Sequence, residues 1–258
     1  MAFVERSTHR LHHRVDGDSG PWLVLSNSLG TDLTMWDAQA AVLAREFRVL
    51  RYDTRGHGRS TAPPSPFSLA DLGADVLALL DALDVDRACF CGLSIGGLTG
   101  QWLGVHAADR FERIVIAASA AKIGTADGWR ERIAQVRDAG LAPLVAATAE
   151  RWFGAAFRAG HDDEVRRVLA ALATTSVDAY VGCCEALAEA DLRPYLCRIV
   201  PPVLAIAGDD DAVTPPAALR FIAEHVVDGH AVVLPGRHLV NIESASAFTA
   251  AVRAFLQR

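Results

Sequence analysis

Short runs of apolar residues alternate along this chain with longer segments in which apolar residues recur every three or four positions. The short runs predict buried strands, and the recurring positions predict amphipathic helices. Residues 22–27 are an example of the first pattern, and residues 69–83 are an example of the second. Strands that alternate with helices in this way predict a largely parallel sheet with helices on both faces.

The alternation occupies two parts of the chain. Strands are predicted at 9–15, 22–27, 47–52, 88–93, 113–118, 203–207 and 231–234. Helices between and after them are predicted at 37–45, 69–83, 95–107, 216–226 and 244–257. Together these elements predict an α/β core made of residues 1–121 and 195–258.

The intervening residues 122–194 have a helical pattern throughout. Four helices are predicted there, at 127–138, 141–153, 162–173 and 176–188. A helical insertion between two stretches of sheet would form a cap over the carboxyl edge of the sheet, where open α/β sheets bind ligands. We therefore expect residues 122–194 to form a cap, or lid, on the core.

Composition and charge narrow the class of protein. Of the 258 residues, 51% are hydrophobic and 22% are charged, as in an ordinary globular protein. The net charge of -6 gives no reason to expect nucleic acid or an anionic membrane as a partner. Residues 1–16 lack the apolar segment of a signal peptide, and no stretch approaches the roughly 20 apolar residues that span a bilayer. The cytoplasm is the simplest location for such a chain.

The cysteines and glycines give no sign of a bound metal or cofactor. The five cysteines are odd in number and irregular in spacing, and none forms a Cys-x-x-Cys pair, which argues against a disulfide framework and a zinc site. The glycine-rich residues 92–97 lack the lysine of a phosphate-binding loop and the full dinucleotide fingerprint. The sequence predicts chemistry without a cofactor.

The pentapeptide Gly-Leu-Ser-Ile-Gly at 92–96 stands where a predicted strand ends and a predicted helix begins. That setting is typical of a nucleophile elbow, a sharp turn that holds a serine hydroxyl above the sheet. Gly92 and Gly96 would leave room for strand and helix to approach closely. We expect Ser94 to be the catalytic nucleophile, and the alternative is a plain turn with a helix-capping serine.

A serine nucleophile needs a base, which in this arrangement follows an acid late in the chain. Three histidines follow the predicted cap, namely His225, His230 and His238. His238 lies in a loop directly after a predicted strand, from which it can reach Ser94. We expect His238 to be the base. His225 falls late in a helix and His230 opens a strand, so structural or surface roles are expected for both.

Three consecutive aspartates follow the strand that should carry the acid. One acid is expected to orient the histidine and stabilise its charged form. The pattern Gly-x-x-Asp-x-x-x-Pro is usual in hydrolases with the chain order serine, acid, histidine. It selects Asp211, which stands four residues before Pro215. Asp209 and Asp210 would then be loop residues that face water or make hydrogen bonds within the turn.

Acyl transfer at a serine also needs two backbone N–H groups that stabilise the oxyanion. One should belong to Ile95, directly after the nucleophile, and the other to the loop at 27–30, where position selects Leu29. The alternative for residues 27–30 is a plain glycine-containing turn.

A second glycine-rich segment, residues 53–60, contains a histidine, His57, which is a second candidate for a catalytic group. His57 stands between two glycines just after a predicted strand, which favours a tight turn. We interpret Asp53, Arg55 and His57 as structural residues.

Several segments resemble the 3-oxoadipate enol-lactonases, a branch of the α/β-hydrolases. Residues 51–60 and 92–97 are typical of the superfamily, while Asn-Ser-Leu-Gly at 27–30 and the His-Leu-x-Asn-x-Glu pattern at 238–243 are more specific. Most relatives have His-Gly at the first two positions of 27–30. The resemblance spans essentially the whole chain. It implies the α/β-hydrolase fold, with a mostly parallel eight-stranded sheet flanked by helices and a helical cap insertion.

The resemblance also implies an activity, the hydrolysis of 3-oxoadipate enol-lactone to 3-oxoadipate in the beta-ketoadipate pathway. This small lactone has a free carboxylate, for which arginine or tryptophan side chains of the cap would be suitable partners. The candidates are Trp129, Arg130, Arg132, Arg137 and Arg151. The alternatives are another hydrolase with the same triad (a simple esterase, a carbon–carbon bond hydrolase or a perhydrolase) or a hydrolase-like receptor that turns its ligand over poorly.

Two features depart from the family pattern. Arg237 precedes the histidine where a small residue is more usual, and Asp209 and Asp210 add charge beside the acid position. Neither departure removes a catalytic group, but both could alter substrate preference or the response to pH.

Overall fold

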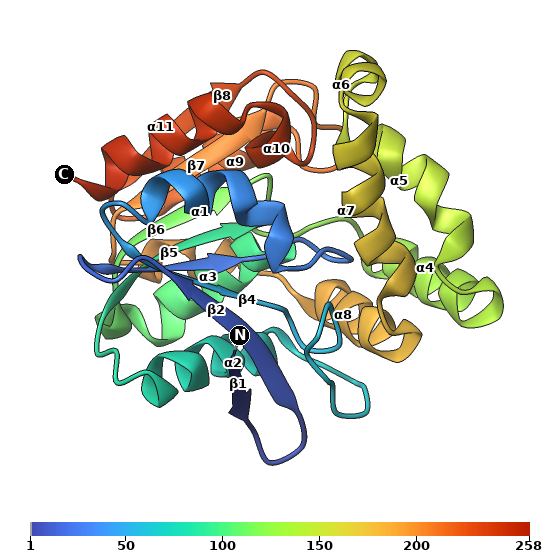
Figure 1. Ribbon diagram of the computed structural model, residues 1–258, viewed down its shortest axis with the longest axis horizontal. Coiled ribbons are helices and arrows are strands. Elements are labelled where there is room, and N and C mark those ends of the chain that lie inside the picture. The colour runs from blue at the N-terminus through green and yellow to red at the C-terminus, as the bar shows by residue number, and fades with distance from the viewer. Residues whose placement is uncertain (1) are drawn as a thin grey trace.

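The computed structural model describes residues 2–258, and a sheet of eight strands forms its centre (Figure 1). In chain order the strands are β1 (Ala2–Glu5), β2 (Arg10–Asp16), β3 (Trp22–Ser26), β4 (Arg48–Tyr52), β5 (Ala88–Leu93), β6 (Phe111–Ala117), β7 (Val203–Gly208) and β8 (Gly229–Leu234). Their order across the sheet is β1-β2-β4-β3-β5-β6-β7-β8. β1 and β2 pair antiparallel with their neighbours, and β3 to β8 are parallel, so the prediction of a mostly parallel eight-stranded sheet is confirmed.

All seven strands predicted from apolar runs are present, with ends within two residues of those expected. The eighth strand, β1, was missed. It has only four residues, and both of its ends are exposed, so it carries no apolar alternation. Pairing with β2 in the register Phe3↔His12 supplies its backbone partners, and the Arg10 guanidinium lies 4.5 Å above the Phe3 ring. A short edge strand of this kind is fixed by its neighbour and not by its own sequence.

Helices cover both faces of the sheet. The helices of the core are α1 (Asp37–Leu43), α2 (Leu69–Ala82), α3 (Ile95–His106), α9 (Pro216–His225), α10 (Val240–Glu243) and α11 (Ala245–Leu256), with the 3-10 turns η1 (Leu33–Trp36), η2 (Ala108–Arg110) and η4 (Arg193–Arg198). Side chains of β3 alternate between the two layers. Leu23 and Leu25 pack in the cluster that contains Trp36 and Phe248, and Val24 packs in the other cluster with residues of α2, α3 and α9.

Polar side chains set the ends of two helices. At the start of α2, the Ser68 hydroxyl accepts from Asp71 N and the Asp71 carboxylate accepts from Ser68 N, which is a capping box. At the start of α4 (Ala126–Ala139), Thr125 Oγ1 accepts from Gly128 N at 3.1 Å. α4 ends at Gly140, whose φ of 71° favours glycine.

Five helices lie between β6 and β7 and are grouped beside the sheet, on the right in Figure 1. They are α4 (Ala126–Ala139), α5 (Val145–Trp152), α6 (Ala155–Gly160), α7 (Asp162–Thr174) and α8 (Val177–Glu189), with the 3-10 turn η3 (Ala142–Leu144). The pattern predicted four helices. The helix expected at 141–153 is divided between η3 and α5, and α6 is additional, because Phe153 leaves the helical conformation and the chain starts a new helix at Ala155. We call residues 122–194 the cap.

Among residues 2–258, none of the helices combines the length and the apolarity that crossing a membrane requires.

Candidate active site

Ser94 occupies the turn between β5 and α3 in a conformation that side chains other than glycine seldom adopt, with φ 59° and ψ -116°. Ser94 N donates to Ala117 O at 2.9 Å, and the Ser119 hydroxyl donates to Ser94 O at 2.8 Å, so the turn is held from the neighbouring strand. Non-glycine residues at positive φ are strained and cluster at functional sites. The turn therefore has the backbone geometry of a nucleophile elbow.

Gly92 allows β5 to approach α3 closely at this turn, and Gly96 allows α3 to approach the end of β3. A Cβ atom at Gly92 would lie 2.1 Å from Gly96 O, and one at Gly96 would lie 2.4 Å from Ser26 O. Any side chain at either position would separate the helix from the strand. Within the described residues, the Ser94 side chain makes no capping hydrogen bond to α3, which argues against a plain helix-capping serine.

His238 and Asp211 form a buried hydrogen-bonded pair in the loops that follow β8 and β7. His238 Nδ1 and Asp211 Oδ2 lie 2.9 Å apart, and both side chains are at most 3% exposed. Asp211 Oδ2 also accepts from the Thr214 hydroxyl at 2.7 Å, and its Oδ1 accepts from Val213 N at 2.8 Å. The carboxylate is thus oriented from its own loop and holds one nitrogen of the imidazole, which leaves the other nitrogen for a second partner.

The surroundings of Asp211 keep its carboxyl group charged. Burial on its own raises the pKa, but the hydrogen bond and charge of His238 and the hydrogen bonds from Thr214 outweigh burial, so the pKa of Asp211 is lowered. A carboxylate of this kind can stabilise an imidazolium ion without taking its proton.

The other candidate histidines and aspartates lie elsewhere. His225 is exposed at the end of α9, and His230 on β8 pairs with Asp228 across 3.4 Å at the surface. Asp209 and Asp210 are exposed loop residues: Asp209 accepts from Gly236 N at 2.9 Å, and Asp210 accepts from the Arg237 guanidinium at 2.7 Å. Of the three aspartates, only Asp211 contacts His238 in the described chain.

A cavity of about 450 Å³ lies between the strand-end loops and the cap. Ser94 and His238 line it from the core, together with Leu29 of the loop after β3. The remaining lining residues are Ser28, Ile123, Gly124, Thr125, Gly128, Trp129, Arg132, Thr148, Arg151, Trp152, Leu172, Tyr180, Leu187, Ala212 and Val213. The space beside Ser94 is therefore closed by residues of both regions.

The backbone groups expected to form an oxyanion hole come from two fixed segments. Ile95 is the first residue of α3, where helix geometry leaves N–H groups without an acceptor in the helix. Leu29 belongs to a loop that Asn27 anchors: the Asn27 amide donates to Tyr52 O at 2.8 Å and accepts from the Trp36 indole at 3.0 Å. Asn27 thus ties the Leu29 loop to β4.

Three of the five cap residues selected from the sequence line this cavity, namely Trp129, Arg132 and Arg151. Trp129 is fixed by a hydrogen bond of 2.7 Å from its indole to Ile123 O. Burial and the neighbouring positive charge of Arg132 lower the pKa of Arg151. Of the residues that line the cavity, none is an aspartate or a glutamate, so the two arginines have no carboxylate beside them in the lining.

Arg130 and Arg137 do not line this cavity. Arg130 is exposed and pairs with Asp127 one turn away, and Arg137 is exposed and pairs with Glu185 of α8. Of the four arginines selected from the sequence, Arg132 and Arg151 are therefore the two that are placed to meet a ligand in this cavity.

The sequence did not single out Thr148 or Tyr180, which also line the cavity. Thr148 is polar and therefore belongs to no apolar pattern that would mark it in the sequence. It stands three residues before Arg151 on α5, and that spacing places both residues on one face of the helix. Tyr180 is one of many buried residues of α8, and only the packing of α8 directs it to the cavity. Burial raises the pKa of Tyr180 to about 12, against the hydrogen bond and positive charge of Arg132.

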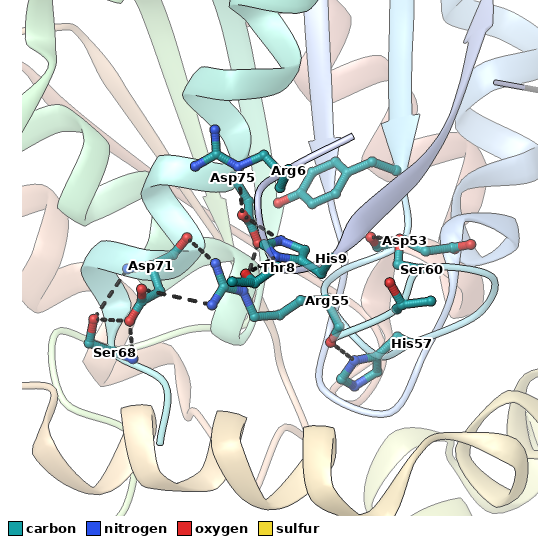
Figure 2. Close-up of polar contacts among 12 residues, drawn as sticks. Arg6, Thr8, His9, Asp53, Arg55, His57, Ser60, Ser68, Asp71 and Asp75 are labelled. Carbon is teal, nitrogen blue, oxygen red and sulfur yellow. Dashed lines mark hydrogen bonds and ion pairs between the residues drawn. The ribbon is translucent and has the colours of Figure 1, made fainter. Parts of the chain in front are cut away.

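Polar contacts join the turn at 53–60 to the N-terminal strands and to α2 (Figure 2), and none of its residues lines the cavity. Asp53 accepts from His12 Nδ1 at 2.7 Å and from Leu33 N at 2.8 Å. Arg55 donates to Asp75 on α2 at 2.7 Å. His57 is fully buried beside Arg55 O, and burial lowers its pKa. These contacts agree with a structural role for the turn.

Comparison with known proteins agrees with this geometry. A family described as "alpha/beta hydrolase fold" matches residues 21–245. Among characterised relatives, 3-oxoadipate enol-lactonase 2 of Acinetobacter baylyi is 47% identical over 238 residues, covering 92% of this chain and 89% of that protein. 3-Oxoadipate enol-lactonase 1 of the same organism is 44% identical over 249 residues, covering 96% and 93%.

Among solved structures, the enol-lactonase from Burkholderia xenovorans LB400 superposes with a TM-score of 0.98 at 42% identity, over 100% of both chains. A family match over most of the chain, together with relatives of this identity and coverage, establishes the grouping. This chain belongs to the α/β-hydrolase family, in the branch that contains the 3-oxoadipate enol-lactonases.

Proposed function

We propose that this protein is a carboxylic ester hydrolase that opens 3-oxoadipate enol-lactone to 3-oxoadipate, a step of the beta-ketoadipate pathway. The observation that carries the proposal is the make-up of one cavity. Ser94 and His238 lie at the core side, and the cap side presents Arg132 and Arg151 without an acidic partner in the lining. Such a cavity suits a small ester that carries one carboxylate, and the named relatives act on a lactone of this kind.

Ser94 is the proposed nucleophile and His238 the proposed base. His238 takes the proton of the Ser94 hydroxyl as the oxygen attacks the lactone carbonyl, and Asp211 stabilises the imidazolium that forms. The hydrogen bond between Asp211 and His238 Nδ1 fixes the tautomer in which Nε2 is free to accept that proton. A tetrahedral intermediate results, with its negative charge on the former carbonyl oxygen.

The backbone N–H groups of Leu29 and Ile95 are proposed to stabilise that oxyanion. Removing one such donor costs about 3–4 kcal/mol of barrier in comparable enzymes. When the intermediate collapses, the ring carbon–oxygen bond breaks and the enol oxygen leaves, taking a proton from His238. The enol becomes a ketone, which makes ring opening hard to reverse. Water activated by His238 then releases the acyl group from Ser94 as a carboxylate.

Arg132 and Arg151 are proposed to bind the free carboxylate of the substrate. Guanidinium groups match carboxylates in shape and charge, and a hydrogen bond to a charged group contributes about 1.5–3 kcal/mol. The carboxylate would also neutralise two like charges that lie close together in a partly buried position. Trp129, held rigid by Ile123, is proposed as an apolar wall for the lactone ring.

The five cysteines of the chain are unpaired in the structure. Reducing conditions keep thiols in this state, so we propose a cytoplasmic location, where aromatic catabolism in bacteria supplies the lactone.

The assay that tests the proposal compares the enol-lactone with its methyl ester and with p-nitrophenyl acetate, using wild-type protein and Ser94→Ala. We expect the free acid to exceed its methyl ester in kcat/KM by about tenfold or more, because the ester cannot pair with Arg132 and Arg151. Ser94→Ala should lower kcat by about a million-fold. Equal turnover of acid and methyl ester would favour a simple esterase.

Labelling with a fluorophosphonate separates a hydrolase from a receptor with the same fold. The reagent forms a covalent bond only with an activated serine, and intact-protein mass spectrometry reports its addition. Wild-type protein should be labelled at Ser94. Absence of labelling would favour a ligand-binding protein that lacks turnover.

A further inference from the structure

The loop that carries His238 is bonded to the end of cap helix α5. Leu239 N donates to Trp152 O at 3.1 Å, and the Arg237 guanidinium donates to Glu150 O at 2.5 Å. Both acceptors are carbonyl groups of the last turn of α5, for which the helix itself provides no N–H donor. The segment on each side of His238 is therefore joined to the cap.

Glu243 joins the same two segments through a single carboxylate. Its Oε2 accepts from Arg237 N at 2.6 Å, directly before the histidine, and its Oε1 accepts from Gly154 N at 2.8 Å, two residues after the end of α5. The side chain is half-buried at the end of α10. A carboxylate has two acceptor oxygens, so one charged group meets two backbone donors that lie 83 positions apart in the sequence, from Gly154 to Arg237.

The loop after β7, which carries Asp211, also contacts the segment before His238. Arg237 Nε donates to Asp210 Oδ2 at 2.7 Å, and Gly236 N donates to Asp209 Oδ1 at 2.9 Å. Arg237, Asp209 and Asp210 are the positions at which the sequence departs from the usual pattern. In the structure they connect the loop of Asp211 to the loop of His238, which gives a physical reason for the added charges.

α5 also carries residues that face the cavity. Thr148, Arg151 and Trp152 line it, and the next residues along the chain reach the Glu243 carboxylate. The helix that presents Arg151 is therefore the helix to which the histidine loop is bonded. A displacement of about 1 Å in a reacting group can lower a rate by about 100-fold.

We propose that Glu243 is a positioning residue that fixes the His238 loop to α5, with Arg237 as its partner, so that the base and the carboxylate-binding arginine keep one spacing. The proposal rests on the proposed role of His238 as base. Neither Glu243 nor Arg237 lines the cavity, so both act through the residues they hold.

The experiment measures how fast a fluorophosphonate labels Ser94 in Glu243→Gln, as a function of pH and per folded molecule. Glutamine offers one acceptor oxygen and turns an N–H₂ group toward the second backbone donor, so one tie is lost. We expect the labelling rate, and kcat/KM for p-nitrophenyl acetate, to fall by about 10- to 100-fold across the pH range. Neither reaction uses the substrate carboxylate, so a loss in both reports on the base.

The matched control is Glu46→Gln. Glu46 also holds two side chains from another segment, Arg253 and Gln257 of the C-terminal residues, but it lies outside the site. It should lower the thermal midpoint by a similar amount and leave labelling unchanged. A merely structural role for Glu243 predicts the same result for both variants, namely labelling within twofold of wild type, and that result would overturn the proposal.

Two further variants test the positioning role and the role of His238 separately. If Glu243→Gln does not fold, Arg237→Ala removes the ties to Glu150 and Asp210, and it should slow labelling about 3- to 10-fold, whereas a rate within twofold of wild type counts against the proposal. His238→Ala tests the foundation. Normal labelling of that variant would refute His238 as base, whereas loss of labelling there with normal labelling in Glu243→Gln would refute only the positioning role.

Discussion

The strand-end loops of the core and the helices of the cap meet in one cavity, but they contribute to it by different physical means. Ser94, Asp211 and His238 each stand within a few residues of the end of a strand, so the sheet fixes where they lie. The cavity-facing residues of the cap are scattered over α4, α5, α7, α8 and the segment before α4, and helix packing decides which helical residues face inward.

The two regions also differ in charge. In the core, the negative charge of Asp211 is met by His238 and Thr214 within its own site. In the cap, Arg132 and Arg151 repel each other and face the cavity, where the lining holds no acidic residue. The carboxylate of Asp211 thus has its partners in the core itself, whereas the two guanidinium groups of the cavity lining have no carboxylate beside them in that lining. On the proposed function, we infer that the core performs the reaction and that the cap selects the substrate.

Asp211→Asn tests the core side and should have the largest effect. The amide cannot stabilise an imidazolium ion and favours the wrong histidine tautomer, so kcat should fall by about 10⁴-fold. The loss should be the same for the enol-lactone and for p-nitrophenyl acetate, because both need the base. Steady-state kinetics with both substrates measures it. Asp228→Asn, at an exposed position, is the control, and a loss confined to the lactone would refute the division of roles.

The sequence predicts long buried elements of the fold better than short exposed ones. Buried strands such as β5 have six consecutive buried residues, a signal that sequence shows directly. β1 and α10 have four residues each, too few for any period to be visible. The extra helix α6 has six residues, none of them buried, so no apolar stripe marks it. Short elements depend on contacts made by the rest of the chain.

The site divides in the same way. The three proposed catalytic residues could be predicted because each follows a strand in chain order. On α4, the apolar residues Ile133 and Val136 mark the buried stripe, with Arg132 on one flank and Arg137 on the other. Which flank faces the cavity depends on how α4 packs on α8, and one helix's sequence does not contain that information.

Arg151→Ala tests the cap side. Loss of one guanidinium should raise KM for the enol-lactone by about 10- to 100-fold, since a charged hydrogen bond contributes about 1.5–3 kcal/mol. Turnover of p-nitrophenyl acetate should stay within about twofold, because this ester has no carboxylate. Arg166→Ala, on the exposed face of α7, is the matched control. An equal loss on both substrates would mean that Arg151 supports the fold of the site and does not select the substrate.

The pH dependence of thermal stability tests the Asp211 site of the core, and we expect a smaller effect there than on catalysis. Because the pKa of Asp211 is lower in the folded protein than in the unfolded chain, its charged form stabilises the fold above the ordinary carboxyl pKa of about 4, and this contribution is lost as pH falls through the folded value. The Asn variant has no such titration. The Tm of wild type should therefore exceed that of Asp211→Asn by more above the ordinary carboxyl pKa than below the folded value, so the difference in Tm should shrink as pH falls below about 4. Thermal melts in buffers of constant ionic strength measure it, and a constant difference at every pH would contradict the prediction.

Arg137→Ala should have the smallest effect, although it removes the same side chain from the same helix as Arg132→Ala. Arg137 pairs with Glu185 across 3.2 Å with 60% of its side chain exposed, and exposed pairs of this kind contribute about 0–1 kcal/mol. We expect KM for the enol-lactone to stay within twofold and Tm to change by a few degrees at most. Arg132→Ala, measured in parallel, should raise KM by about tenfold or more. If both variants raised KM equally, the position of each arginine relative to the cavity would not matter, and the assignment of Arg132 to substrate binding would be refuted.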